Sequence, residues 1–205
     1  MKSIVKLLLG AVIITAASCS GNGKGGATDT DSTTSLNSNS TDAAMDSNKK
    51  ELKAKDSTAV KADYEYAVKA ANGGMLEVEL GKLAQNKAIS PQVMKFANMM
   101  VADHAKANTE LKAIAASKFI TLPAILSNDK QKDYDDFSKM KREDFDKAYI
   151  EYMVKDHKAD IEEFKKEAKD GKDAELKAFA GKHVPILQHH LQMAEQAATT
   201  VKNKK

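Results

Sequence analysis

Two five-residue strings each place a histidine at the centre of an apolar helical face. Met100-Val-Ala-Asp-His104 and Met153-Val-Lys-Asp-His157 lie 53 positions apart, and each falls inside a long stretch of helical period. At about 100° per residue, the neighbours of each histidine on its own face are mainly aliphatic residues, alanine and phenylalanine. A solvent-facing histidine would have charged neighbours. The sequence therefore predicts two long helices that each bury an imidazole.

The composition favours helices and argues against a nucleic-acid partner. The chain has 205 residues, of which 42% are hydrophobic and 30% charged, with three prolines and no tryptophan. Alanine, lysine, glutamate, methionine and leucine are common, which favours helices over strands. The formal charge of +3 falls to +1 when Lys2 and Lys6 are removed with a leader. Lysines alternate with acids, which indicates a solvated face of ion pairs, not a basic nucleic-acid footprint.

The N-terminus has the pattern of a bacterial lipoprotein. Residues 1–18 combine two lysines, an apolar core too short to span a membrane and a small-residue end, as in a signal peptide. Cys19 is the only cysteine and follows directly, which resembles a lipobox. We expect lipid on Cys19, palmitate included, and a periplasm-facing protein at the outer membrane of the cell envelope. The alternative is ordinary cleavage that leaves a free thiol.

The next segment reads as a tether. Residues 19–58 are rich in Gly, Ser, Thr, Asn, Asp and Lys and offer little apolar surface to bury, which predicts a flexible linker. Some helix is expected from Ala43 onward. A folded domain follows over residues 59–201, and residues 202–205 form a basic tail.

The domain is predicted to be all-α, a ferritin-like four-helix bundle. Short links join the first two helices, and the last two, into antiparallel hairpins. The connection between the hairpins, residues 119–142, is long enough to run back along a bundle of about 40 Å, with a short helix at 134–140. One long crossover between two hairpins is the ferritin-like arrangement. The four long helices are expected at residues 61–88, 91–118, 143–170 and 173–201.

Each of these helices carries an ionisable group on its apolar face. Glu77 lies in a seam of small residues on the first helix, whereas Glu79 points about 160° away. The fourth helix offers His190 or His183. Helix rise puts His190 about 28 Å from the second hairpin turn, roughly two turns from the others, so height favours His183. The inward set is therefore Glu77, His104, His157, and either His190 or His183.

Such a set suits a transition metal. Buried ionisable groups need partners or a metal ion, and three imidazoles with a carboxylate fit zinc, copper, iron or manganese. Met100 and Met153, one turn from their histidines, are further candidate ligands that favour copper. Asp103 and Asp156 are expected to orient the ligands from outside. The alternative is a metal-free, hydrogen-bonded cluster that fixes helix register.

Several motifs together resemble one family. The chain is similar, over residues 63–198, to the exported bacterial proteins of the domain of unknown function 4142, which carry the label "predicted outer membrane protein" and are grouped with ferritin-like folds. The resemblance implies a helical bundle in the envelope and favours His190 over His183, but it implies no established activity. The motifs are Gly74-Met-Leu-Glu77, Gly81-Lys-Leu-Ala84, Phe96 to His104, Phe145-Asp146 with Tyr149, Asp156-His157 and Pro185 to Ala194.

The sequence points away from enzymes that use other recognisable motifs. Di-iron enzymes need Glu-x-x-His on two helices, but valine or leucine stands three residues before His104, His157 and His190. No nucleophilic triad, phosphate loop or haem motif can be proposed. We expect a protein that binds, senses or buffers one metal ion and is more plausibly not an enzyme. The alternative is a metal-free structural or interaction module, and the sequence does not identify a protein partner.

Overall fold

The computed structural model describes residues 40–54 and 61–202, which contain six helices and no strand. The all-α prediction is confirmed. The leader, Cys19 and most of the predicted tether lie outside the described residues. None of the described helices is long and apolar enough to cross a membrane. The helices are α1 Thr41–Ala54, α2 Lys61–Lys87, α3 Pro91–Ser117, α4 Asn128–Lys139, α5 Arg142–Asp170 and α6 Ala174–Lys202.

The four long helices begin and end within one residue of their predicted bounds, because local signals fix them. Ser90 is extended and precedes Pro91 at the start of α3. At the other end, the Ile120 backbone N–H donates to the Ala115 carbonyl at 2.9 Å. Asp173 caps α6, where its Oδ1 accepts from the backbone N–H of Leu176 at 3.0 Å.

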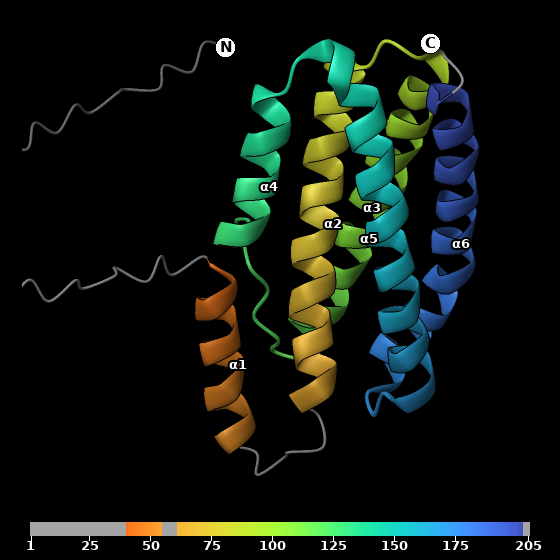
Figure 1. Cartoon of the computed structure of the whole chain (residues 1–205). Coiled ribbons are helices and arrows are strands. Elements are labelled where there is room, and N and C mark those ends of the chain that lie inside the picture. The colour runs from red at the N-terminus through yellow and green to blue at the C-terminus, as the bar shows by residue number, and fades with distance from the viewer. Residues whose placement is uncertain (1–39, 55–60, 203–205) are drawn as a thin grey trace, which may run out of the picture. The chain divides into compact units, whose positions relative to one another are not determined.

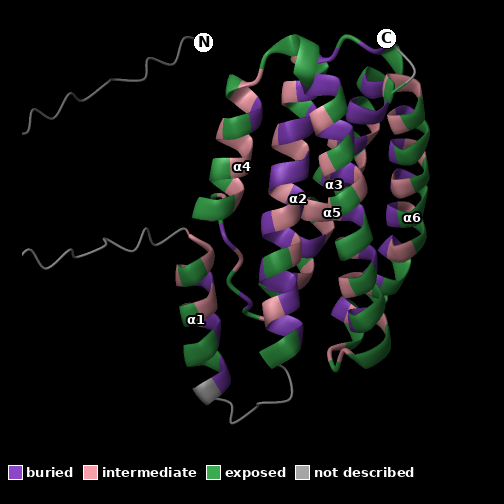
Figure 2. Cartoon of the chain, in the orientation of Figure 1, coloured by how far each residue is buried: buried purple, intermediate pink, exposed green. Residues whose placement is uncertain are grey.

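The long helices lie side by side as two antiparallel hairpins, α2–α3 and α5–α6 (Figure 1). α2 also packs on α5, and α3 on α6, so all four share one interior. α3 and α5 run in the same direction because the connection through α4 returns along the molecule, as predicted (Figure 1). Buried positions recur on the inward sides of these helices (Figure 2).

The connection contains more helix than predicted. α4 covers Asn128–Lys139, whereas a helix was expected only over residues 134–140. Polar contacts with α2 hold both of its ends. The Lys87 ammonium donates to the carbonyls of Ser138 and Met140 at 2.5 and 2.7 Å. The Asn72 amide donates to Ser127 Oγ at 2.7 Å. These long-range contacts, which local propensity does not reveal, extend the helix.

Within the predicted linker, where some helix was expected from Ala43 onward, residues 41–54 form α1, which packs on α2. Ala44, Asn48 and Leu52 recur at four-residue spacing and form a buried stripe. The Asn48 side chain also pairs with the backbone of Thr121, donating at 3.0 Å and accepting at 2.8 Å. A segment without enough apolar surface of its own is thus ordered by a partner from the crossover.

A polar layer separates two apolar clusters in the interior. One cluster lies toward the α2–α3 turn and includes Met100 and Met153, so both methionines, candidate ligands in the sequence, pack in this apolar cluster. The other lies toward the α5–α6 turn and includes Leu111 and Phe179. The predicted Glu and His residues lie along the helices between these clusters.

Candidate metal centre

The structure brings together one predicted side chain from each long helix. Glu77 of α2, His104 of α3, His157 of α5 and His190 of α6 expose only 2%, 7%, 0% and 1% of their surface. The three histidines offer ring nitrogens that all lie within 4.8 Å of one another. Helical period had placed each side chain inward, and the packing of the two hairpins makes them neighbours.

The three imidazoles meet around His190 Nδ1. This atom lies 3.3 Å from His104 Nε2 and 3.4 Å from His157 Nε2. Glu77 joins from the side: its Oε2 lies 2.8 Å from His104 Nδ1, and its Oε1 lies 3.6 Å from His157 Nε2. Glu77 Oε1 is buried without a hydrogen-bond partner in the described residues.

Partners outside the cluster set the tautomers of two rings. His157 Nδ1 lies 3.0 Å from the Met153 carbonyl oxygen, which only accepts, so Nδ1 carries the hydrogen and Nε2 is bare. His190 Nε2 lies 2.9 Å from Asp103 Oδ2, so this nitrogen donates and Nδ1 is bare. Two nitrogen lone pairs therefore face each other across 3.4 Å. Neutral rings in this arrangement lack a hydrogen between these two atoms.

The third ring depends on Glu77. An ionised Glu77 accepts from His104 Nδ1, which leaves His104 Nε2 bare and adds a third lone pair to the cluster. A protonated Glu77 donates to His104 Nδ1 instead, and His104 Nε2 then carries a hydrogen toward His190. With Glu77 protonated, the centre therefore holds one additional proton. With Glu77 ionised, it presents three unprotonated imidazole nitrogens.

The spacing of the nitrogens fits a metal ion. Zinc–nitrogen bonds are about 2.0–2.1 Å long, so two nitrogens on a tetrahedral ion lie about 3.3–3.4 Å apart. The separations of 3.3 and 3.4 Å at His190 Nδ1 have this length. Glu77 Oε1 lies 3.6 Å from His157 Nε2, but Glu77 lies within metal-ligand distance of Asp156 and His157 together and not of all three imidazoles, so it would have to shift to supply a fourth donor.

Burial keeps the imidazoles neutral. Desolvation lowers the pKa of His104 to about 4, although Asp156 and Asp103 oppose the shift. The same cause lowers the pKa of His157 to about 3 and that of His190 to about 4. Burial raises the pKa of Glu77 well above its usual value, and Asp156 adds to that shift. At neutral pH the rings are therefore available as ligands.

Two further carboxyl groups lie beside the centre on α5. Burial is the main cause that raises the pKa of both Asp156 and Asp160, and Glu77 raises that of Asp160 further. Lys130 of α4 partly compensates them, with Nζ 3.6 Å from Asp156 Oδ1. Asp156 was predicted; Asp160 and Lys130 were missed. Asp160 follows His157 by three residues, so helical period places it on the same face, but no local signal directs Lys130 toward the site.

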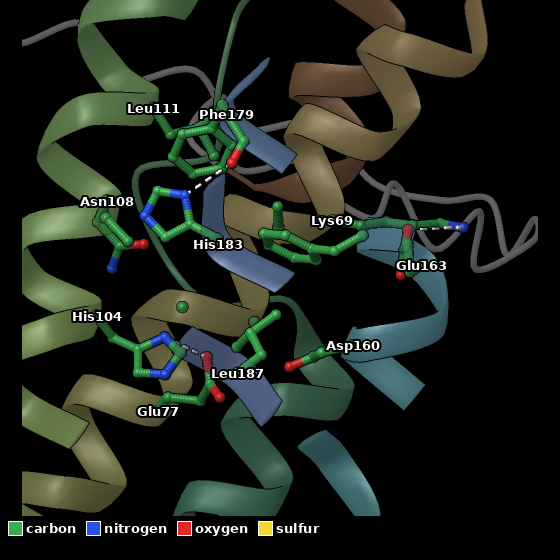
Figure 3. Close-up of a pocket in the computed structure, with 15 residues that line it drawn as sticks. Lys69, Glu77, His104, Asn108, Leu111, Asp160, Glu163, Phe179, His183 and Leu187 are labelled. Carbon is green, nitrogen blue, oxygen red and sulfur yellow. Dashed lines mark hydrogen bonds and ion pairs between the residues drawn. The ribbon is translucent and has the colours of Figure 1, made fainter. Parts of the chain in front are cut away.

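His183 is not part of the cluster, so the choice by helix height was wrong. Its Nδ1 lies 2.8 Å from the Phe179 carbonyl oxygen, one turn back on α6. The ring lines a neighbouring cavity of about 40 Å³, together with Glu77, His104 and Asp160. Figure 3 shows His183 on one side of this cavity and the paired Glu77 and His104 on the other. Asp103, predicted beside the ligands, holds His190 from outside.

Comparison with known proteins gives a family but no further relative. No curated protein and no solved structure matches the chain. The family comparison matches residues 48–197, which cover α2 to α5, most of α6 and the second half of α1. The chain therefore belongs to the family described as domain of unknown function (DUF4142).

Proposed function

We propose that this protein binds one transition-metal ion through Glu77, His104, His157 and His190, and that it senses or buffers that metal in the cell envelope. The observation that carries the proposal is the pair of bare nitrogens at 3.4 Å, His157 Nε2 and His190 Nδ1, each fixed by a hydrogen bond on its far side. Metal-bound histidines commonly donate their other N–H to a carbonyl or carboxylate in this way.

The donor set favours binding over catalysis. With Glu77 shifted to join the three imidazoles, four protein donors would fill a tetrahedral ion, as in closed structural sites, whereas catalytic sites keep one position open. The ligands are also nearly shielded from solvent, with at most 7% of any of them exposed. Nitrogen and oxygen donors fit zinc, iron, manganese or copper. Met100 and Met153 pack in the apolar cluster, so they no longer favour copper over the other metals as candidate thioether ligands.

The proposal includes the setting of the site. Two antiparallel hairpins joined by a long connection support a ferritin-like four-helix bundle as the architecture. The signal-peptide pattern and Cys19 support a lipid-anchored protein that faces the periplasm from the outer membrane. Labelling with a palmitate analogue tests this setting. The label should appear on the wild type and be lost with Cys19→Ser; label that persists in the variant contradicts it.

Elemental analysis tests the metal proposal. The full-length protein is purified in detergent without a histidine tag and offered zinc, copper, iron and manganese separately. We expect about one ion per chain and a higher melting temperature with the bound metal. A His104→Ala/His157→Ala double variant should bind none, with circular dichroism as the check on helix content. Absence of metal from the folded wild type would overturn the proposal and favour the metal-free structural or interaction module.

A further inference from the structure

A groove between α3 and α6 gathers four of the five histidines in the chain. It has a volume of about 390 Å³, far more than the small cavity on the other side of His104. Its walls hold two of the three imidazoles of the metal centre. The polar residues that the argument uses are Asp103, His104, Glu110, His183, His189 and His190.

Asp103 connects this groove to the centre. Its side chain is 44% exposed, while that of His190 is only 1% exposed, and the two meet at 2.9 Å. His190 therefore lies between the groove and the cluster, with Nε2 toward Asp103 and Nδ1 toward the other imidazoles. From the solvent in the α3–α6 groove, the carboxylate of Asp103 and then the ring of His190 lead to the other two imidazoles.

Two lysines, Lys106 and Lys182, and two carboxylates, Asp103 and Glu110, line the groove, so its formal charges balance and the attraction for a cation is local to Asp103. Glu110 is compensated by Lys182, whose Nζ lies 2.7 Å from Oε2. Asp103 contacts His190, and no lysine or arginine of the described residues lies within ion-pair distance of it, so this partly exposed carboxylate can attract a cation. His189 is exposed and lines the same groove, where it adds a nitrogen ligand near the surface.

The opposite approach to the centre is less suitable. The cavity next to Glu77 holds about 40 Å³, too little for a divalent ion with its water shell. On the side of α4, Asp156 already has a cationic partner, because Lys130 Nζ lies 3.6 Å from its Oδ1.

We propose that the α3–α6 groove is the port through which the metal ion reaches and leaves the centre, with Asp103 and His189 as its first ligands. This inference rests on the proposed function. A hydrated divalent cation exchanges waters for the carboxylate oxygen and the exposed imidazole, and then passes inward to His190 and His104. Asp103 thus has a second role besides orienting His190.

Rates of Co²⁺ uptake test the port, because bound Co²⁺ is visible by absorbance. Stopped-flow mixing compares the full-length wild type with Asp103→Asn, His189→Ala and the double variant. Asparagine still offers an oxygen to His190 Nε2, so the ring keeps its position. We expect uptake to slow severalfold in His189→Ala with one ion per chain at equilibrium, and about tenfold or more in the double variant, whose affinity also falls because Asp103 orients His190. Added salt should slow the wild type more than Asp103→Asn.

Glu162→Gln is the matched control, because this carboxylate of α5 is 74% exposed and does not line the groove. Its uptake rate should equal that of the wild type. An unchanged rate in the double variant would overturn the port while leaving the metal centre standing. A lower number of ions per chain in His189→Ala would overturn it as well, since His189 would then be a permanent ligand. A wild type that takes up no Co²⁺ would overturn the centre itself.

Discussion

Glu77 of α2 and His104 of α3 form a buried pair in which Oε2 lies 2.8 Å from Nδ1. Burial raises the pKa of the carboxyl group well above its usual value and lowers that of the imidazole to about 4. Burial therefore favours the neutral form of the pair, in which the carboxyl group keeps a proton that it would lose in water. When Glu77 keeps this proton, His104 Nε2 carries a hydrogen and cannot bind a metal ion.

Metal binding should consequently release about one proton and strengthen as pH rises. Apparent affinity should rise by up to about tenfold per pH unit over the range in which the carboxyl group of Glu77 still holds its proton, and that range extends upward because burial raises its pKa. Toward pH 4, His104 and His190 take up protons and the dependence becomes steeper. Calorimetry in buffers of different ionisation enthalpy measures the released protons. Binding with no proton release would contradict this account of the pair.

Replacing Glu77 by glutamine should remove both the proton and a donor. We expect Glu77→Gln to weaken metal binding by at least about tenfold and to abolish proton release. Glu79→Gln is the control on the same helix, because Glu79 pairs with Lys82 at 2.7 Å on the surface. Competition with a coloured chelator gives both affinities. Equal losses in the two variants would show that Glu77 has no special role.

His190→Ala and His183→Ala separate the two histidines between which the sequence left the choice open. His190 Nδ1 lies within 3.4 Å of both other imidazoles, whereas His183 is bonded to its own helix. His190→Ala should lose the metal, and His183→Ala should keep about one ion per chain by elemental analysis. The reverse result would place the centre around His183.

The close approach of α2 to α3 can be tested at Gly81. A methyl group there would lie 2.7 Å from Val101 Cγ2 and 3.3 Å from the Ala97 carbonyl oxygen. Gly81→Ala should cost about 1–3 kcal/mol of stability, partly offset by about 1 kcal/mol of helix propensity. Val101→Ala in the same chain should remove most of the clash, which a double-mutant cycle in urea measures. Strictly additive effects would refute the contact.

Glu167 should make the fold less stable as pH rises. It is 6% exposed with one oxygen unpaired in the described residues, and burial raises its pKa to about 7. The unfolded chain ionises near its usual pKa of about 4.3, so the free energy of unfolding falls between about pH 4 and 7 and levels off above. Glu167→Gln should flatten that part of the slope in urea titrations. An identical slope in the variant would contradict the shift.

The sequence predicts the long helices and the inward faces well, because both depend on local information. Pro91 and Gly171 mark helix ends, and apolar period sets which side chains share a face. Glu77, His104 and His157 were identified in this way. Some helix was expected from Ala43 onward, but the packing of α1 could not be predicted from its own residues, since it depends on the pairing of Asn48 with Thr121 from a distant loop.

The error at His183 has a geometric cause. Helix rise counts Cα positions, which put His190 about 28 Å and His157 about 21 Å from the turn between their helices. Side chains lean toward the N-terminus of their own helix. In an antiparallel pair, His157 therefore leans away from that turn and His190 toward it. The two imidazole rings therefore meet although the Cα atoms of His157 and His190 lie at different heights along the bundle.

Because each long helix supplies one proposed ligand, a bound metal would affect how the protein unfolds. Glu77 and His104 belong to one hairpin, and His157 and His190 to the other. A bound ion would cross-link the two hairpins, so that they could not separate without breaking metal–ligand bonds. Removal of the ion would then speed unfolding and expose the chain to proteases. The abundance of such a protein in the cell would follow the supply of its metal.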